Sequence, residues 1–409
     1  MARLRILAPA VLLVVCLPLS AAQPWQAFAE GTHGKASLRY INGLPVLTVA
    51  GTPEEMGEQV GALTSKPLRQ ISAYPRLLLS LARGRASWER LVGTSKKLLP
   101  GFPSDYQKEM DALAKSSKVD SELLLVGNTF PDILKAGGCS TIIVEAERSA
   151  THEPLFGRNL DYPSLGFLYN YSLVTIYHPT GKHAFASVGF PGMLGCVSGM
   201  NDAGLAVATL EVYYSKDGAP RLNLAGTPYT LCFRRILEEC TTVAEAERLL
   251  RSMKRTTMNN LAVCDRSGGA VFEITSRSLV VRKPVEDLCC CTNHFRTEQL
   301  APDATPRMLA LQKCRRFACL REAASMAHLG LPDIARKLNE VNQGSHTLQS
   351  MIFEPATLKL HLAAGRPPAS ALPMKTIDLA PLFERKEHAA GPAGANRPGT
   401  KAAPAAISR

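Results

Sequence analysis

The sequence predicts a layered α+β fold, because helical and strand patterns occur in separate blocks along the chain. Residues 23–138 are predicted mainly as helices joined by short loops. From Cys139 onward, short strand patterns dominate, and helices interrupt them in pairs. Elements that are segregated in this way are typical of sheets covered by helices.

Within residues 23–138, a strand at 44–49 precedes a well-marked helix start. Thr52 is placed as the N-cap, Pro53 stands in the first turn and two glutamates follow. Gly57 and Gly61 share one face of this helix, so we expect another element to pack closely against it. The alternative is that the two glycines only weaken the helix.

After Cys139, each strand pattern has a length and alternation typical of a half-buried strand. The predicted strands are 172–178, 183–188, 205–214, 261–264, 270–275 and 279–282, with helices at 227–239, 242–253, 303–327 and 331–342 and a closing hairpin of 350–354 and 357–363.

The two ends of the chain differ in composition from the rest. A basic start, an apolar stretch from Ile6 to Leu19 and the small residues Ser20 to Ala22 predict a secretory signal peptide over 1–22. The protein is therefore expected to be secreted or periplasmic, with no integral membrane span. Residues 386–409 are rich in Ala, Gly and Pro and lack periodicity, which predicts a disordered tail.

The composition is that of a globular protein, with 46% hydrophobic and 20% charged residues. The net charge is +12, but the basic residues are scattered and aromatic residues make up only 6% of the chain. This pattern argues against nucleic-acid binding and indicates at most an unspecific attraction to anionic surfaces or substrates.

The run Cys289–Cys291, close to His294, is the one cluster that suggests a metal site. Adjacent residues of a strand point to opposite faces, so three consecutive cysteines do not converge on one ion, and the chain has no Cys-x-x-Cys pair. We therefore expect neither a metal nor a cofactor. Disulfides among the other cysteines stay open, since a sequence does not give their pairing.

Cys139 is the candidate nucleophile. It opens an alternating strand, and the next strand of the same predicted hairpin carries Arg158 and Asp161. A cut between Gly138 and Cys139 would give the thiol a neighbouring α-amino group, whose pKa of roughly 8 suits a general base. The alternative is an inert buried cysteine.

Two further polar positions allow both a structural and a functional interpretation. Asn201 stands in a good turn motif and is as compatible with a structural role as with a functional one. Glu211 interrupts the apolar strand 205–214, which a purely structural interpretation does not explain.

Short motifs at the strand ends, taken in order, resemble a known group of enzymes. They are Gly-Cys-Ser at 138–140, Gly-Arg-Asn-Leu-Asp-Tyr at 157–162, Met-Asn-Asp-Ala-Gly-Leu at 200–205 and Thr-Asn-His-Phe at 292–295. They are similar to the N-terminal-nucleophile (Ntn) hydrolases of the choloylglycine hydrolase, acid ceramidase and N-acylethanolamine amidase group. They look most like the C45-type branch with the acyl-CoA:6-aminopenicillanate acyltransferase. The resemblance implies a four-layer αββα fold, with a catalytic domain over 139–385 behind a pro-segment over 23–138.

The resemblance also implies roles for single residues. Cys139 matches the nucleophile, Gly138–Cys139 the self-cleaved bond, and Arg158 with Asp161 the pair that holds the thiolate and the new amino group. Asn293 matches an asparagine near the amino group and the oxyanion, and Arg307 matches a second active-site arginine.

At Glu211 the bile-salt and penicillin enzymes have an asparagine, whereas the ceramidase and N-acylethanolamine branch has a glutamate. This difference favours lipid-like amides over bile salts as substrates.

The sequence thus predicts an exported zymogen that cuts itself and then transfers an acyl group from a linear amide, through a Cys139 thioester, to water or an amine. The predicted partners are a small amide or acyl substrate and the cleaved pro-segment, which is expected to stay associated. The alternative is a non-catalytic exported binding protein that retains the fold.

Overall fold

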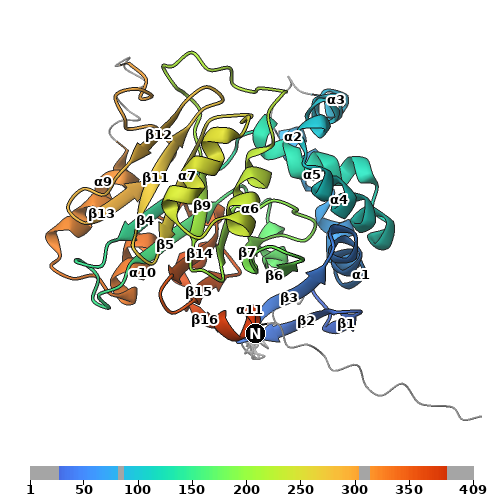
Figure 1. Ribbon diagram of the computed structural model, residues 1–409, viewed down its shortest axis with the longest axis horizontal. Helices are drawn as coiled ribbons and strands as arrows, with labels where there is room; N and C mark the ends of the chain where they lie inside the picture. Colours follow the sequence, from blue (N-terminus) through green and yellow to red (C-terminus); the bar gives the residue numbers. More distant parts are fainter. Residues whose placement is uncertain (1–26, 82–86, 304–313, 385–409) are drawn as a thin grey trace, which may run out of the picture.

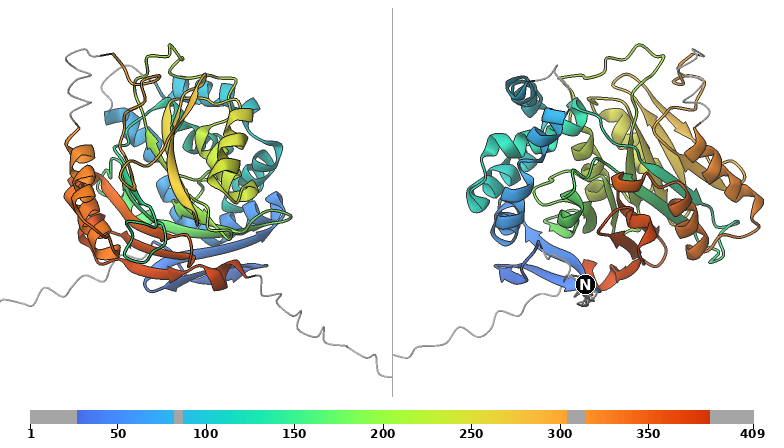
Figure 2. Two further views of the ribbon diagram at one scale, coloured as in Figure 1. Left: turned by 60° about the vertical axis from the view of Figure 1, so that its left-hand side comes forward. Right: turned by 180° about the vertical axis from the view of Figure 1, so that it is seen from behind.

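The computed structural model describes residues 27–81, 87–303 and 314–384. Two stacked sheets lie in its centre, and helices cover the outer face of each (Figures 1 and 2). The signal peptide predicted over 1–22, the tail predicted over 386–409 and Arg307 lie outside the described residues.

The larger sheet has ten strands, and all of its neighbouring strands are antiparallel except β3 and β6, which run parallel. In spatial order they are β1 (Gly31–His33), β2 (Ala36–Ile41), β3 (Leu44–Gly51), β6 (Leu173–Pro179), β7 (Phe185–Gly189), β8 (Ser198–Asn201), β9 (Ala206–Glu211), β10 (Asn259–Asp265), β11 (Gly268–Ile274) and β12 (Leu279–Arg282).

The strands β1 to β3 show that residues 23–138 are less purely helical than predicted. Only β3 was expected. The β2–β3 hairpin closes through Asn42 and Gly43, both with positive φ (50° and 76°). Such an Asn-Gly pair is the preferred turn of a tight hairpin, and it went unused in the sequence-based prediction.

The smaller sheet has six antiparallel strands. Their spatial order is β13 (Leu288–Cys291), β4 (Ser140–Val144), β5 (Leu155–Asp161), β14 (Thr347–Glu354), β15 (Lys359–Ala364) and β16 (Lys375–Asp378). Cys139 immediately precedes β4, so the candidate nucleophile lies at the end of a central strand.

The helices form two groups. Those beside the larger sheet are α1 (Pro53–Ile71), α2 (Tyr74–Leu81), α3 (Trp88–Leu98), α4 (Ser104–Ser117), α5 (Ser121–Ile133), α6 (Tyr229–Glu239) and α7 (Val243–Ser252). Those beside the smaller sheet are α9 (Arg315–Arg321) and α10 (Leu331–Glu340), and α11 (Ala380–Phe383) follows β16. Short 3₁₀ turns occur at Leu99–Gly101, Leu168–Tyr171, Glu322–Ser325, Gly344–His346 and Ala369–Ala371.

Helix α1 begins as the sequence predicts. Thr52 Oγ1 accepts a hydrogen bond from the Glu55 amide, and the Glu55 carboxylate accepts one from the Thr52 amide, which completes a capping box. A Cβ at Gly57 would lie 2.1 Å from the Glu109 carbonyl oxygen, and one at Gly61 would lie 1.8 Å from Ser116 Oγ. The close packing expected at these two glycines is therefore confirmed, and α4 is the partner.

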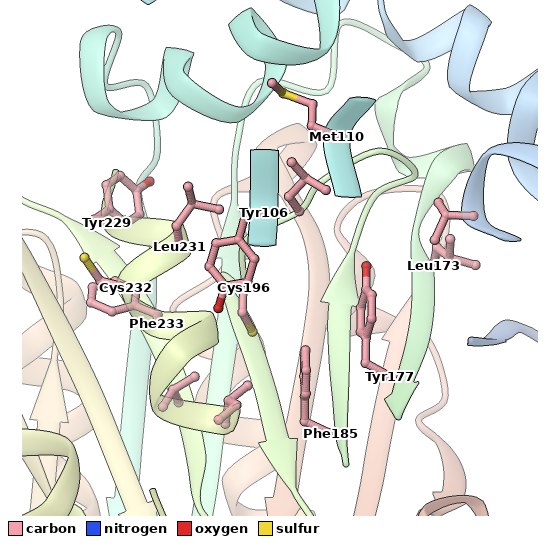
Figure 3. Close-up of a cluster of buried hydrophobic side chains, with 14 of the residues drawn as sticks. Tyr106, Met110, Leu173, Tyr177, Phe185, Cys196, Tyr229, Leu231, Cys232 and Phe233 are labelled. Carbon is pink, nitrogen blue, oxygen red and sulfur yellow. The ribbon is translucent and has the colours of Figure 1, made fainter. Parts of the chain in front are cut away.

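Three buried clusters give the order of the layers. The first fills the space between the larger sheet and its helices, where Tyr177 and Phe185 stack at 4.8 Å (Figure 3). The second lies between the sheets and includes Cys139, Cys289 and Cys291. The third, with Cys290, lies between the smaller sheet and the helices α9 and α10. The layered α+β prediction is confirmed, and the consecutive cysteines alternate between faces as expected.

A buried ionic cluster joins the bundle before Cys139 to the helices after it. Arg234 on α6 contacts Glu109 on α4 and Glu238 on α6, each at 2.7 Å. The Tyr106 hydroxyl donates to Glu238 at 2.8 Å, and the Arg234 guanidinium lies 4.5 Å from the centre of the Tyr106 ring. All three charged side chains are 1% exposed, so the cluster fixes how α4 packs on α6.

Two further observations bear on the predicted class of protein. Among the residues that the structure describes, the ten cysteines form no disulfide. No helix in the described ranges is long and apolar enough to span a membrane.

Candidate active site

The hairpin of β4 and β5 brings the first three candidate residues together. Thr141 pairs with Arg158, and the Gly138 amide donates to the Asp161 carbonyl at 2.9 Å. Cys139 and Thr141 lie on the same face of the sheet because side chains alternate along a strand. Arg158 lies opposite Thr141, so its guanidinium and the thiol face the same space between the sheets.

Arg158 is fully buried and reaches across to the larger sheet. Its Nη1 donates to the Thr209 carbonyl on β9. Its Nε and Nη2 have no hydrogen-bond partner among the described residues, which is rare for a buried guanidinium. The cation therefore has donors left for an anion beside Cys139.

The Cys139 thiol is 2% exposed. Burial raises its pKa above the usual value of 9.0, Arg158 partly opposes this, and the charges of Asp161 and Glu211 add to the rise. A thiol held in this way stays protonated at neutral pH while the chain is intact.

Asp161 is buried with both carboxylate oxygens bonded. Thr347 Oγ1 donates to Oδ1 at 2.5 Å, and Gln343 Nε2 donates to Oδ2 at 2.9 Å. Burial raises the pKa of Asp161, and these two donors and the nearby arginines act in the opposite direction. The carboxylate is thus fixed in orientation next to the peptide that precedes Cys139.

Glu211, at the end of β9, holds the segment before Cys139. Its Oε2 accepts hydrogen bonds from the amides of Ala136 at 2.8 Å and Gly137 at 2.7 Å, and the Tyr213 hydroxyl donates to the Gly137 carbonyl at 3.1 Å. Burial raises the pKa of Glu211 to about 7. These hydrogen bonds give a structural reason for the presence of a glutamate in the otherwise apolar strand of the intact chain.

Asn293 follows β13 and lies next to Glu211. Its Nδ2 donates to the Glu211 carbonyl at 2.9 Å, and its Oδ1 accepts from Arg316 Nη2 at 3.1 Å. Asn260 supports this loop by donating to the carbonyls of Thr292 and His294.

Asn201 does not belong to this group. Its side chain donates to the carbonyls of Leu237 and Cys240 and accepts from the Leu205 amide, so its contacts are structural.

Two residues that the sequence did not single out contact the Gly138–Cys139 peptide. Arg316 Nη1 donates to the Gly138 carbonyl at 3.2 Å and to the Cys139 carbonyl at 2.6 Å, and Gln343 Nε2 also donates to the Gly138 carbonyl. Arg316 starts a short helix and Gln343 stands in a loop, and neither has a local motif that would have identified it. Arg307, the arginine selected from the sequence, lies outside the described residues.

An apolar cavity of about 110 Å³ leads to Cys139. Its walls come from α1, α2 and α5 on one side and from the sheets, their loops and the start of α6 on the other. They include Leu68, Ile71, Tyr74, Leu124, Gly127, Phe130, Leu160, Tyr162, Phe190, Met193, Val197 and Tyr229, and Cys139 and Glu211 also line the cavity.

Potential metal ligands gather away from Cys139. In the described ranges, one group has suitable spacing, namely Cys319, Glu322 and Glu340. The Lys337 ammonium already binds the two glutamates of this group, at 3.2 and 2.8 Å. Arg336 also pairs with Glu340 at 3.1 Å, so two cations already face the two carboxylates, and this arrangement does not favour a metal ion.

Among known proteins, the chain has a related sequence in an archaeon. It is 23% identical over 275 residues to an uncharacterized protein of Archaeoglobus fulgidus, and the match covers 59% of this chain and 45% of the archaeal protein. The chain therefore spans less than half the length of that relative.

Solved structures show more distant similarity. An N-acylethanolamine-hydrolyzing acid amidase orthologue of Caenorhabditis elegans has a TM-score of 0.42 at 16% identity, covering 58% of this chain and all of that chain (100%). A variant of the conjugated bile acid hydrolase of Clostridium perfringens has a TM-score of 0.41 at 16% identity, covering 59% of this chain and 92% of that chain. Penicillin V acylase from Agrobacterium tumefaciens has a TM-score of 0.38 at 15% identity, covering 59% of this chain and 86% of that chain.

The family comparison is the decisive one. The profile of the acyl-coenzyme A:6-aminopenicillanic acid acyl-transferase family matches residues 148–369, which is more than half of the chain and includes β5 to β15. The chain belongs to the acyl-coenzyme A:6-aminopenicillanic acid acyl-transferase family of Ntn hydrolases.

Proposed function

We propose that this protein is an exported cysteine Ntn hydrolase or acyltransferase that cuts its own Gly138–Cys139 bond and then acts on linear amides through a Cys139 thioester. The family acts on carbon–nitrogen amide bonds. The observation that carries the proposal is that Glu211 holds the peptide before Cys139 by accepting from the amides of Ala136 and Gly137. Asn293 bonds to the carbonyl of the same glutamate, and the buried Arg158 and Asp161 lie on the hairpin that Cys139 opens.

The cut would convert an inert thiol into a nucleophile. In the intact chain the Cys139 nitrogen is an amide and has no basicity, so the precursor is inactive on external amides. The freed α-amino group, with a pKa of roughly 8, takes the thiol proton and later delivers a proton to the leaving amine. Arg158 stabilises the thiolate through its unused donors, and Asp161 orients the ammonium form.

Asn293 and Arg307 keep the roles that the resemblance implies. The Asn293 side-chain nitrogen carries two N–H groups, and one of them donates to the Glu211 carbonyl. The second is a donor for the oxyanion of the tetrahedral intermediate, and such a donor contributes roughly 3 kcal/mol in other enzymes. Arg307 is proposed as an active-site arginine.

The cavity supports an apolar acyl group as the transferred part of the substrate. Its walls are almost entirely aliphatic and aromatic, and it ends at the Cys139 thiol. A polar acyl group would lose its hydration there without gaining a partner. We therefore propose amides of medium-length aliphatic or aromatic acids, with Glu211 at the polar end of the cavity near the scissile bond.

The pro-segment is proposed to remain bound after the cut. Its strand β3 pairs with β6, its helix α4 holds Arg234 through Glu109, and its helices form one wall of the cavity. Losing it would remove half of the acyl site, so the active form is proposed to contain both pieces.

Intact mass and N-terminal sequencing of the purified protein test the proposal, with Cys139→Ala as the matched control. The expected result is a wild-type fragment that begins Cys-Ser-Thr-Ile and a Cys139→Ala chain without that cut. If both chains stay uncut at Gly138–Cys139, the proposed mechanism fails at its first step. A non-catalytic binding protein that retains the fold would then be the better description.

A further inference from the structure

The carbonyl of Gly138 is held by two side chains that come from far along the chain. Gln343 Nε2 donates to this oxygen, and Arg316 Nη1 donates to it at 3.2 Å. In the self-cleavage proposed above, the Cys139 thiol would attack this carbonyl group. We propose that Gln343 is a catalytic residue of the cut and forms, together with Arg316, the oxyanion hole for the tetrahedral intermediate at Gly138. This inference rests on the proposed self-cleavage.

The chemistry of its neighbours fixes the orientation of the Gln343 amide. Nε2 faces the Gly138 carbonyl and, at 2.9 Å, Asp161 Oδ2. A carbonyl and a carboxylate are both acceptors, so the nitrogen and not the oxygen of the amide must face them. Its two protons thus serve the scissile carbonyl and the carboxylate beside it.

The loop between α10 and β14 holds Gln343 in place. The backbone amide of Gln343 donates to Thr347 Oγ1 at 2.8 Å, and the Thr347 hydroxyl in turn donates to Asp161 Oδ1 at 2.5 Å. Gln343, Thr347 and Asp161 therefore form a closed network around the scissile peptide. A donor fixed in this way needs no reorganisation when charge develops on the carbonyl oxygen.

Gly138 itself fits this function. A Cβ at this position would lie 2.3 Å from Gln343 Nε2 and 3.0 Å from its Cδ, so a side chain there would require the end of the Gln343 side chain to shift. A glycine before the cut thus allows the donor to come this close.

The cut proceeds through a tetrahedral intermediate and a thioester. Cys139 Sγ bonds to the Gly138 carbonyl carbon, and the carbonyl electrons move to the oxygen, where Gln343 and Arg316 donate to it. The thiol proton passes to the Cys139 nitrogen as the carbon–nitrogen bond breaks, which leaves a Gly138 thioester and a free α-amino group on Cys139. Water then attacks the thioester, the carbon–sulfur bond breaks, and the thiol and the Gly138 carboxylate are released.

The test compares Gln343→Met with Gln107→Met. Gln107 is a matched control, because it is also partly buried and its Nε2 donates to a backbone carbonyl, that of Phe102. The chains are made by cell-free translation, and the fraction cut is followed over time. Because removal of one oxyanion donor costs roughly 10²–10³-fold in rate, Gln343→Met should cut that much more slowly than wild type and Gln107→Met should not.

Gln343→Glu separates a lost donor from a damaged fold. The substituted side chain has nearly the same size, but it can donate to Gly138 only when protonated. The ratio of its cutting rate to that of wild type should therefore rise as the pH falls, which a misfolded chain would not show. Melting temperatures in the Cys139→Ala background should stay within a few degrees of the parent.

The outcomes are distinct. A wild-type chain that is never cut refutes the proposed function. A wild-type chain that is cut while Gln343→Met matches Gln107→Met refutes the oxyanion role and leaves the function standing. If the ratio of the Gln343→Glu cutting rate to the wild-type rate does not change with pH, the oxyanion role of Gln343 is also refuted.

Discussion

Glu211 is buried at 3% exposure with its pKa raised to about 7, and this makes the stability of the protein depend on pH in a defined way. In the unfolded chain the same carboxyl titrates near its ordinary value of 4.5. Between these two values the folded protein holds a proton that the unfolded chain has lost. The Glu211 contribution to stability therefore falls as the pH rises through this window.

The size of the effect follows from the two pKa values. Since one pKa unit corresponds to about 1.4 kcal/mol, ionising Glu211 above pH 7 costs the folded state about 3 kcal/mol. Glu211→Gln removes this cost, and its side-chain oxygen can still accept from the Ala136 and Gly137 amides. The variant should gain about 3 kcal/mol at pH 8 and little near pH 4.5.

Urea unfolding measures this in the Cys139→Ala background, where the proposed cut does not intervene. The free energy of unfolding is determined at pH 5 and pH 8 with and without Glu211→Gln. Glu153→Gln, at an exposed site, serves as the control and should change little at either pH. A Glu211→Gln chain that is equally or less stable at pH 8, or whose difference from the parent is the same at both pH values, would refute the reasoning.

Two other predictions concern the core and the cavity. In the Cys139→Ala chain, Arg234→Met should cost roughly 3–5 kcal/mol in urea unfolding, because it leaves Glu109 buried without its cation and leaves Lys182 as the remaining cation at Glu238. Arg235→Met, at the half-exposed pair with Glu239, should cost less than about 1 kcal/mol. Similar losses for both variants would contradict the role of the cluster. An octanoyl amide should have a higher kcat/KM than the acetyl amide of the same amine. In Gly127→Leu the new side chain enters open space at the cavity wall, so the ratio of the octanoyl to the acetyl kcat/KM should fall by roughly tenfold. An unchanged ratio would place the acyl group elsewhere.

The sequence predicted the parts of the site that depend on local order along the chain. Cys139, Arg158 and Asp161 share one hairpin: strand alternation puts Cys139 and Arg158 on one face, and the pairing of Gly138 with Asp161 at the open end of the hairpin brings Asp161 close. Glu211 was noticed because a charge stood in an apolar strand. Whether these residues act in catalysis stays a prediction.

The rest of the site depends on contacts between distant segments. Gln343 reaches Gly138 over 205 positions and Arg316 over 178, and nothing in their local sequence signals this. The turn predicted at Asn201 to Gly204 is present, since the Gly204 amide donates to the Asn201 carbonyl at 3.0 Å. The strand before it, β8, was not predicted, and there a Cβ on Gly199 would lie 2.4 Å from the Ala186 carbonyl oxygen, so this strand also depends on a contact with a distant segment.

The parallel pairing of β3 with β6 has a consequence for how the protein can be produced. A chain that began at Cys139 would lack β1 to β3, and the row of N–H and C=O groups along one side of β6 would have no strand to pair with. β6 is apolar and almost completely buried, so its bare edge would recruit other copies of the chain. The part of the chain from Cys139 onward is therefore expected to aggregate when expressed alone, and recombinant expression is expected to need β1 to β3 as a folding partner.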